Sequence, residues 1–403
     1  MFERFECKRI VRYDGEEKVS EYKIELSERA KELAGTAGLE ESYLADLVGQ
    51  VLKKGDELGY NLGGNIVVGL DVNGPIVACD DVNLMPFPGA IESIENLMNT
   101  EDVEVTLMTG WDLSTMGFFK RNKLKLEQIG IVGEYGMVYE RAGNFRYLYP
   151  YREEERLEFT YGVLKAAAEM DVKVAFQGNY SPGSGAIYAE GDEHGQLLSH
   201  ALVKDRRPTM RQLYEAAAGK SDIELTEDES KIVFENKPEN LKGISEALFK
   251  THPLISVRVK KEEDGKLSIW IDPKDKPDFD FEKVKEFAKL AGEQIGRKAL
   301  PYEDHGVDLI SKEAEDGNYS KDAGLREYGR EAFGDKPFIS AIIGDKGSDI
   351  PKTIKETIMF PLKDSDAEKI SDEQSIPSVP VKDVRDFALA LAEAHRIKAQ
   401  QNS

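Results

Sequence analysis

The sequence predicts an α/β fold, with a Rossmann-like, doubly wound parallel sheet as its core and a second α/β domain inserted into it. The first observation is an apolar, β-branched-rich run at residues 66–70 without polar alternation, which is typical of a strand buried on both faces of a parallel sheet. The second is the alternation of strand-like and helix-like patterns that continues to about residue 138. The third is the length of 403 residues, which exceeds the size at which a single core stops growing. We therefore expect two domains.

The predicted domain boundaries lie where this alternation changes. Residues 65–148 and 301–403 are expected to form the parallel-sheet core, and residues 149–300 the inserted α/β domain. Strand-like pieces of the insertion are found at residues 172–176, 186–189, 231–234, 254–259 and 267–271, and helical patterns near 155–170, 209–218, 239–250 and 281–295.

Residues 1–64 precede the first core strand and form a predicted N-terminal helical extension. Between Leu39 and Leu52 apolar residues recur at helical spacing, so an amphipathic helix is expected. Its apolar face either docks on the core or makes a partner or homo-oligomer contact, and the sequence leaves both interpretations open.

The composition excludes several classes of function. A formal net charge of −22 repels phosphate backbones, so general binding to nucleic acid or to an anionic membrane is not expected. The sequence shows neither an apolar span of about 20 residues nor the apolar core of a signal peptide at its start. We therefore expect a soluble, cytoplasmic protein. Cys7 and Cys79 are far apart and in no CxxC pair, which argues against a zinc ribbon or a disulfide framework.

Four short motifs follow one another along the chain, each at the end of a predicted strand or the start of a predicted helix. They are, in order, DVNGP from Asp71, TLMTG ending in Thr109 and Gly110, NYSKD with Lys321, and GDKGSD with Asp345 and Asp349. In type, order and placement they resemble the motifs of the haloacid dehalogenase (HAD) superfamily of phosphohydrolases. The resemblance spans residues 65–394, and the inserted block resembles the large α/β cap of the sugar-phosphate phosphatase branch. The turn Glu134-Tyr135-Gly136 also resembles one found in relatives with large caps.

The resemblance implies a Mg²⁺-dependent phosphoryl transfer. Asp71 would be the nucleophile that forms an aspartyl-phosphate. Asp71, Asp345 and the backbone carbonyl of Asn73 would hold the Mg²⁺, because this hard cation takes oxygen ligands. Asp349 would hold a metal-bound water or orient Lys321, a supporting role in the metal site.

The phosphate group itself requires donors and positive charge. The hydroxyl of Thr109 and the N–H of Gly110 are suited to a phosphate oxygen, and Lys321 would neutralise the phosphoryl charge. Lys336 and Lys346 lie nearby in sequence, the second within the last motif, so they remain alternatives to Lys321.

Asn73 departs from the family pattern. Phosphatases of the family carry an Asp at this position, which protonates the leaving group and then activates water. An amide cannot shuttle a proton, and losing general acid/base assistance typically costs ~10²–10⁴-fold in rate. Pro75, where the family prefers Thr, is a second and smaller departure.

The sequence therefore leaves two functions of different class open. The first is a phosphohydrolase or phosphotransferase that acts on a small phosphorylated metabolite, for which a sugar phosphate is the candidate because large caps of this kind often serve sugar phosphates. The alternative is a catalytically impaired HAD-like protein that binds a phosphorylated ligand or a protein partner without efficient turnover. A third possibility, a scaffold that binds basic partners, is supported by the net charge alone.

Three further features have simpler interpretations than a site. Asp80 and Asp81 follow a second short apolar run and are expected in a turn rather than at a metal. The Gly/Ser-rich stretch 178–186 lacks the GK[ST] ending of a P-loop, so it is a hairpin or a sugar- or phosphate-contacting loop. His194 and His200 are six residues apart, whereas two ligands on one helix face lie three or four apart, so we expect surface histidines.

Overall fold

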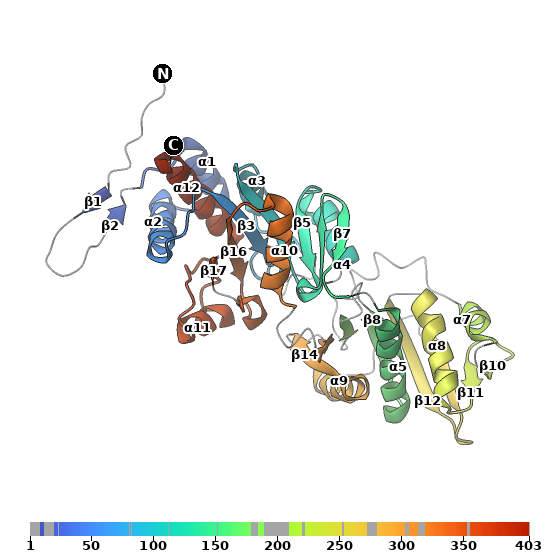
Figure 1. Cartoon of the computed structure of the whole chain (residues 1–403). Coiled ribbons are helices and arrows are strands. Elements are labelled where there is room, and N and C mark those ends of the chain that lie inside the picture. The colour runs from blue at the N-terminus through green and yellow to red at the C-terminus, as the bar shows by residue number, and fades with distance from the viewer. Residues whose placement is uncertain are drawn as a thin grey trace. The chain divides into compact units, whose positions relative to one another are not determined.

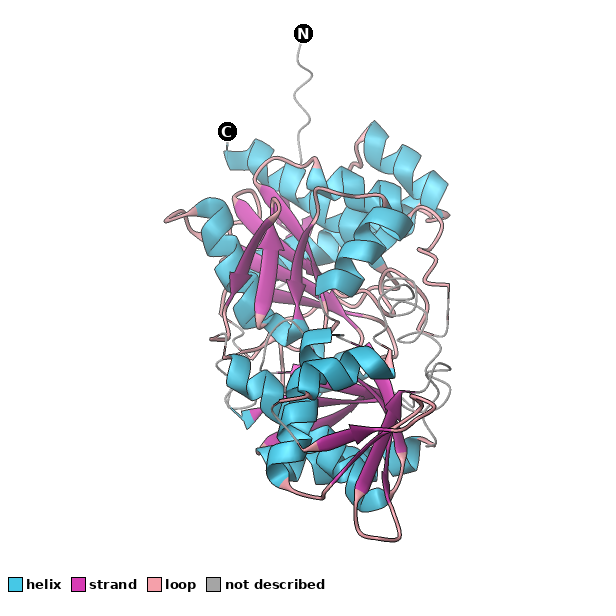
Figure 2. Cartoon of the chain, turned by 90° about the vertical axis from the view of Figure 1, so that its right-hand side faces the viewer, coloured by secondary structure: helices cyan, strands magenta, loops and turns pink. Residues whose placement is uncertain are grey.

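The structure is a computed structural model of the chain, divided into two compact units. One unit comprises Met1–Trp111, Phe119–Arg146 and Ser320–Ser403, and the other Asp112–Phe118 and Tyr147–Tyr319. The residues described are 9–11, 20–22, 24–79, 81, 83–111, 113–150, 152–178, 184–188, 209–219, 222–251, 254–271, 280–302, 306–312, 319–352 and 355–402. Figure 1 labels many of the elements of both units, and Figure 2 shows that helices pack against the strands in each.

The first unit is built on a seven-stranded sheet. Its strand order is β17-β16-β3-β4-β5-β6-β7. The strands are β3 Asn65–Leu70, β4 Val103–Met108, β5 Gly130–Gly133, β6 Val138–Arg141, β7 Asn144–Tyr147, β16 Phe338–Gly344 and β17 Thr357–Pro361. The pairs from β17 through β5 are parallel and β6 runs antiparallel to β5. The predicted α/β core with a parallel sheet is thus confirmed.

The register of this sheet places the motif residues at one edge. Leu70 of β3 lies opposite Ile343 of β16 and opposite Leu107 of β4. Because parallel strands end at the same edge, the residues that follow β3, β4 and β16 meet there. Strand β3 itself is buried from Ile66 onwards, which explains its unbroken apolar run.

Helices cover this sheet. They are α1 Glu28–Ala37, α2 Glu41–Leu58, α3 Ala90–Met98, α10 Lys321–Phe333, α11 Asp366–Glu373 and α12 Val384–Asn402. Helix α10 packs along β3, where a Cβ on Gly69 would lie 3.0 Å from Leu325. A short antiparallel pair, β1 Arg9–Val11 and β2 Ser20–Tyr22, precedes α1.

The predicted amphipathic helix of the N-terminal extension is α2, and its apolar face docks on the core. Leu44, Val48, Val51 and Leu52 are fully buried, and α1 and α2 contact α12, as Figure 1 shows. The extension is therefore part of the first unit rather than a separate segment. A homo-oligomer contact through it stays a prediction.

The second unit is an eight-stranded antiparallel sheet with helices. Its strand order is β10-β11-β13-β12-β8-β9-β15-β14. The strands are β8 Lys173–Gly178, β9 Ser184–Tyr188, β10 Ile223–Leu225, β11 Ile232–Phe234, β12 Leu254–Lys261, β13 Leu267–Ile271, β14 Arg297–Tyr302 and β15 Gly306–Ser311. The helices are α5 Glu153–Met170, α7 Met210–Ala217, α8 Pro238–Thr251 and α9 Phe281–Ile295. Phe159, Phe176 and Phe287 lie in the core between them.

The domain boundary expected at residue 301 is wrong by about twenty residues. Strand β14 pairs with β15, and β15 pairs with β9, so both belong to the sheet of the second unit. The chain returns to the first unit at Ser320. Strand β15 is an apolar buried run like the core strands, and local pattern does not tell which sheet such a run joins.

The structure modifies one expected helix, and several residues singled out in the sequence lie outside the described part of the chain. The helix expected near 114–125 is α4 Leu113–Phe119 followed by a π-helix at Lys120–Leu124. Cys7, Asp80, His194, His200 and most of the stretch 178–186 lie outside the described residues. Among the described helices, none is both long and apolar enough to span a membrane.

Candidate active site

The backbone brings the first and last motifs together. The N–H of Asp71 donates to the carbonyl of Ile343 at 3.1 Å, which extends the pairing of β3 and β16 past the end of β3. Gly74 then turns the chain with a φ of +86°, a conformation that favours glycine. A Cβ at Gly74 would lie 2.8 Å from the carboxyl carbon of Asp345, so glycine is required here by the turn and by the close approach.

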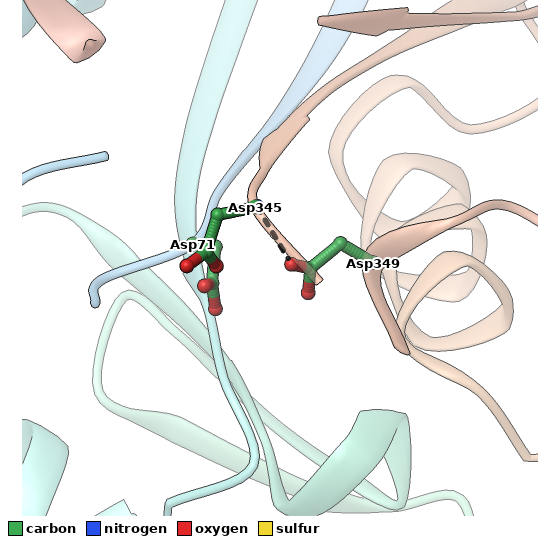
Figure 3. Close-up of side chains that lie close together, drawn as sticks. All are labelled: Asp71, Asp345 and Asp349. Atoms are coloured by element: carbon green, nitrogen blue, oxygen red, sulfur yellow. Dashed lines mark hydrogen bonds between the residues drawn. The ribbon is translucent and has the colours of Figure 1, made fainter. Parts of the chain in front are cut away.

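Three carboxylates converge at this edge. Each of Asp71, Asp345 and Asp349 offers an oxygen, and these oxygens lie within 4.8 Å of one another. Figure 3 shows the side chains of Asp71 and Asp345 next to each other and that of Asp349 approaching from the turn after β16. Like charges this close repel strongly inside a protein, so the cluster requires positive charge.

Lys321 supplies one positive charge. Its Nζ donates to Oδ1 of Asp71 at 2.9 Å and to Oδ1 of Asp349 at 2.5 Å. The lysine is 6% exposed, so the ion pairs are shielded from water. Of the three lysines that the sequence left open, Lys321 is thus the one paired with Asp71. Lys336 lies two residues before β16, at the opposite end of the strand from Asp345.

Lys321 is held in place by the beginning of α10. Ser320 caps the helix, since its hydroxyl accepts from the N–H of Ala323. Gly136, with a φ of +84°, lies against this cap, and a Cβ there would overlap the carbonyl oxygen of Ser320. The turn Glu134-Tyr135-Gly136 therefore has a structural role: it lets α10 begin close to the sheet edge, which sets the position of Lys321.

Asp349 acts through its neighbours. Its Oδ2 accepts the backbone N–H groups of Asp345 at 3.1 Å and of Lys346 at 3.0 Å, the first of which is the dashed line in Figure 3. Its Oδ1 accepts from Lys321. Both oxygens are engaged and the side chain is buried, an arrangement that fits a residue orienting Lys321 and the metal-site turn rather than a direct metal ligand.

Two buried oxygens at the site lack hydrogen-bond partners among the described residues, and they test whether a cation fits. These are Oδ1 of Asp345 and Oδ1 of Asn73. A buried polar atom without a partner costs ~1–3 kcal/mol, so native proteins usually satisfy it. Oxygen atoms of carboxylates and amides are the ligands of hard dications such as Mg²⁺. The residues present therefore fit such an ion.

The protonation states follow from burial and charge. Burial and the carboxylate of Asp349 raise the pKa of Asp71 to about 7, although the ammonium of Lys321 acts in the opposite direction. Burial likewise raises the pKa of Asp345 above its ordinary value, against the field of Lys346. Burial lowers the pKa of Lys321, but Asp349 and Asp71 outweigh it and the net direction is upward. Lys321 thus stays cationic, and a further cation is what would keep the carboxylates of Asp71 and Asp345 ionised.

Thr109 and Gly110 lie at the end of β4, at the same edge of the sheet. The N–H of Thr109 donates to Val132 at 3.0 Å, and its hydroxyl oxygen accepts from the N–H of Trp111 at 3.1 Å. The hydroxyl hydrogen therefore remains available to donate. A Cβ on Gly110 would lie 2.7 Å from the ring of Tyr135, so a larger residue there would displace that ring.

Sequence reasoning missed two groups at the site. The side-chain oxygen of Asn73 is one of the unpartnered atoms, whereas the metal ligand expected from this residue was its backbone carbonyl. The thiol of Cys79 donates to Oδ2 of Asp345 at 3.5 Å. No spacing rule indicates either contact, because both depend on the turn that follows Gly74. Asp81, by contrast, accepts the N–H groups of Asn83 and Met85, which is the turn role that was predicted.

Comparisons with known proteins yield structural likenesses only. No family model matches the chain, and no curated protein does. Among solved structures, a HAD subclass IIB sugar phosphatase is 13% identical, covers 83% of this chain and 100% of its own, and has a TM-score of 0.44. A haloacid dehalogenase-like hydrolase from B. subtilis is 12% identical and has a TM-score of 0.41. The match covers 81% of this chain and 98% of the hydrolase. A trehalose-6-phosphate phosphatase from Aspergillus fumigatus is 9% identical and has a TM-score of 0.37. The match covers 87% of this chain and 97% of the phosphatase.

Proposed function

We propose that this chain is a Mg²⁺-dependent phosphohydrolase or phosphotransferase, in which Asp71 attacks a phosphate monoester and becomes an aspartyl-phosphate. The observation that carries the proposal is the buried pairing of Asp71 with Lys321, beside the carboxylate of Asp345. A strand-end carboxylate, a fixed ammonium and an acidic ion site are the groups that phosphoryl transfer requires.

Asp71 is suited to be the nucleophile because it is already oriented. Its backbone N–H is bonded to Ile343 and its Oδ1 to Lys321. The two bonds restrict the carboxylate, and holding a reactive group in place lowers the barrier to attack. Lys321 also balances the negative charge that a phosphoryl group brings to the site.

Asp71, Asp345 and an oxygen of Asn73 would hold the cation. When bound, Mg²⁺ would neutralise charge on the phosphoryl oxygens and keep the carboxylates ionised. Asp349 would keep Lys321 and the turn after β16 in position. The hydroxyl of Thr109 and the N–H of Gly110 would donate to the phosphoryl oxygens.

Asn73 limits the chemistry. Its amide N–H can donate a hydrogen bond to a leaving oxygen but cannot transfer a proton to it. Hydrolysis of an unactivated monoester is therefore expected to be slow, and transfer involving a good leaving group faster. The substrate we propose is a small phosphorylated metabolite, with a sugar phosphate as the candidate that the large inserted domain suggests by its resemblance to sugar-phosphate caps. The proposed location is the cytoplasm.

The test uses a panel of phosphate monoesters and p-nitrophenyl phosphate with the full chain, with and without Mg²⁺. Asp71→Asn is expected to lose roughly 10³-fold or more in kcat/KM, since an amide does not replace the nucleophile. Asp366→Asn, on the exposed first turn of α11, is the matched control and is expected to keep full activity. Activity that survives in Asp71→Asn would eliminate Asp71 as nucleophile.

Asn73 also supports the second candidate, a protein that binds a phosphorylated ligand without efficient turnover. Under this alternative the wild-type chain binds phosphate esters in the presence of Mg²⁺ but turns none of them over. Calorimetry with the same panel separates the two functions, because binding without product identifies the second one.

A further inference from the structure

The first unit has a polar pocket away from the acidic cluster. It has a volume of about 240 Å³ and lies between the second half of α10 and the beginnings of β16 and β17. It is lined by Arg326, Arg330, Gly334, Lys336, Pro337, Phe338, Ser340, Lys355 and Glu356. Strand β16 separates it from Asp345, since Phe338 begins that strand and Asp345 follows its end. At ~3.3 Å per residue, the two sites are roughly 20 Å apart.

The charge of this pocket is opposite to that of the chain. Arg326, Arg330, Lys336 and Lys355 line it together with one carboxylate, Glu356, whereas the whole chain has a formal net charge of −22. The cationic side chains that line the pocket repel one another. An anion bound between them would reduce that repulsion. A concave arrangement of like charges also concentrates the potential inside the pocket.

The cationic groups are partly fixed. The guanidinium of Arg326 donates to the carbonyl of Lys355 at 3.0 Å and to the hydroxyl of Thr357 at 3.2 Å. These bonds join α10 to the start of β17, so the group is positioned before any ligand arrives. Lys355 and Glu356 are 4.0 Å apart and exposed, which makes their pair weak. Within the described part of the chain, Lys336 has no carboxylate partner.

A helix end does not explain the cluster. Arg330, in the last turn of α10, pairs with Glu327 one turn earlier and favourably faces the negative end of the helix. One cation is sufficient for that purpose. Arg326, Lys336 and Lys355 are additional, and they come from the helix, the loop after it and the segment before β17.

The size and the lining indicate the class of ligand. A volume of 240 Å³ is below the ~300–1,000 Å³ of typical small-molecule sites, so a nucleotide would be too large. Arginine and lysine bind phosphate through charge-assisted hydrogen bonds. Pro337 and Phe338 add an apolar part that would accept a few carbon atoms.

We propose that this pocket binds a phosphate dianion, either free phosphate or the phosphate group of a small metabolite, at a site separate from Asp71. The binding needs no divalent cation, because the positive charge comes from the protein. It also weakens with salt, since the lysines are exposed to solvent.

The test is isothermal titration calorimetry with inorganic phosphate, at low ionic strength and with EDTA present. The wild-type chain is expected to bind, and Lys336→Gln/Lys355→Gln to bind at least tenfold more weakly. Lys53→Gln/Lys289→Gln removes two exposed lysines elsewhere and the same net charge, and it is expected to bind as the wild type does. Asp71→Asn is also expected to retain phosphate binding.

The outcomes separate the possibilities clearly. No binding by the wild type, or equal affinity of the two double variants, would overturn the proposal. A parallel titration with glucose 6-phosphate distinguishes the source of the ligand: tighter binding than inorganic phosphate identifies a phosphorylated metabolite, and equal or weaker binding identifies the free ion. The result does not depend on whether Asp71 is catalytic.

Discussion

At the scale of single residues, Asn73 determines what the site can do. It lies two residues after Asp71, in the turn that Gly74 closes, and its side-chain oxygen is buried without a hydrogen-bond partner. An amide at this place binds and orients but transfers no proton. A carboxyl group of nearly the same shape would add the missing acid.

Asn73→Asp is therefore expected to raise the hydrolysis of phosphate monoesters by ~10²–10⁴-fold, mainly in kcat. The gain should be smallest for p-nitrophenyl phosphate, whose leaving group needs little protonation. Steady-state kinetics on both substrate types measures this. An unchanged rate on every ester would indicate that another group already acts as the acid, or that the reaction is not hydrolysis.

Lys321 offers a second test at this scale. In Lys321→Met the carboxylates of Asp71 and Asp349 lose their buried cation, and removing one partner of a buried pair typically costs ~3–5 kcal/mol of unfolding free energy. Urea unfolding measures the loss, and Mg²⁺ is expected to recover part of it.

Lys120→Met is the matched control for that experiment. Lys120 is as buried as Lys321, and its Nζ pairs with Glu140 at 2.5 Å within the same unit. Its removal is expected to destabilise the chain similarly but to leave phosphatase activity intact at a temperature where the protein is folded. Full activity in Lys321→Met would contradict the role given to Lys321.

At the scale of elements, the start of α10 is what brings the third motif, with Lys321, to the sheet edge. Glu134, Tyr135 and Gly136 all have positive φ, and Gly136 lies directly against Ser320. A Cβ added to Gly324, on the first turns of α10, would also lie within 3 Å of Gly136. The close approach of this turn and this helix sets the position of Lys321.

Gly136→Ala is expected to lower the unfolding free energy by ~3 kcal/mol or more and to reduce activity, because the new methyl group displaces the helix start. Gly143→Ala is the control, since Gly143 has a φ of +77° but no atom within 4 Å of an added Cβ. That variant should show only the backbone strain, about 1 kcal/mol. Equal losses in the two variants would show that contact with Ser320 is unimportant.

At the scale of the whole molecule, the acidic cluster makes stability depend on pH and on cations. The pKa of Asp71 is raised to about 7 in the folded chain, whereas an unfolded Asp has a pKa of ~3.9. Between these values the folded state holds a proton that the unfolded state has lost. Stability without metal therefore falls as the pH rises from about 4 to about 7 and stays lower above that.

A dication that binds the ionised carboxylates should reverse this loss. The rise in melting temperature on adding Mg²⁺ is expected to be larger at pH 8 than at pH 6, since binding at pH 6 must first release a proton. Asp345→Asn should abolish most of the rise, and Asp366→Asn should not. A Mg²⁺ effect that is the same at both pH values would contradict the raised pKa of Asp71.

The sequence by itself determined the parallel-sheet core, the inserted domain and the residues that reach the sheet edge. Those features are local: an apolar run specifies a buried strand, and the residue after it lies at the strand's end. The same information could not assign β15 to its sheet, because a buried strand has the same pattern in either unit. Only the tertiary structure decided that, and it also decided that Lys321 pairs with Asp71, that Cys79 contacts Asp345, and that four cations surround one pocket. Each of these depends on distances between segments far apart in the chain, which the amino-acid pattern of any one segment does not contain.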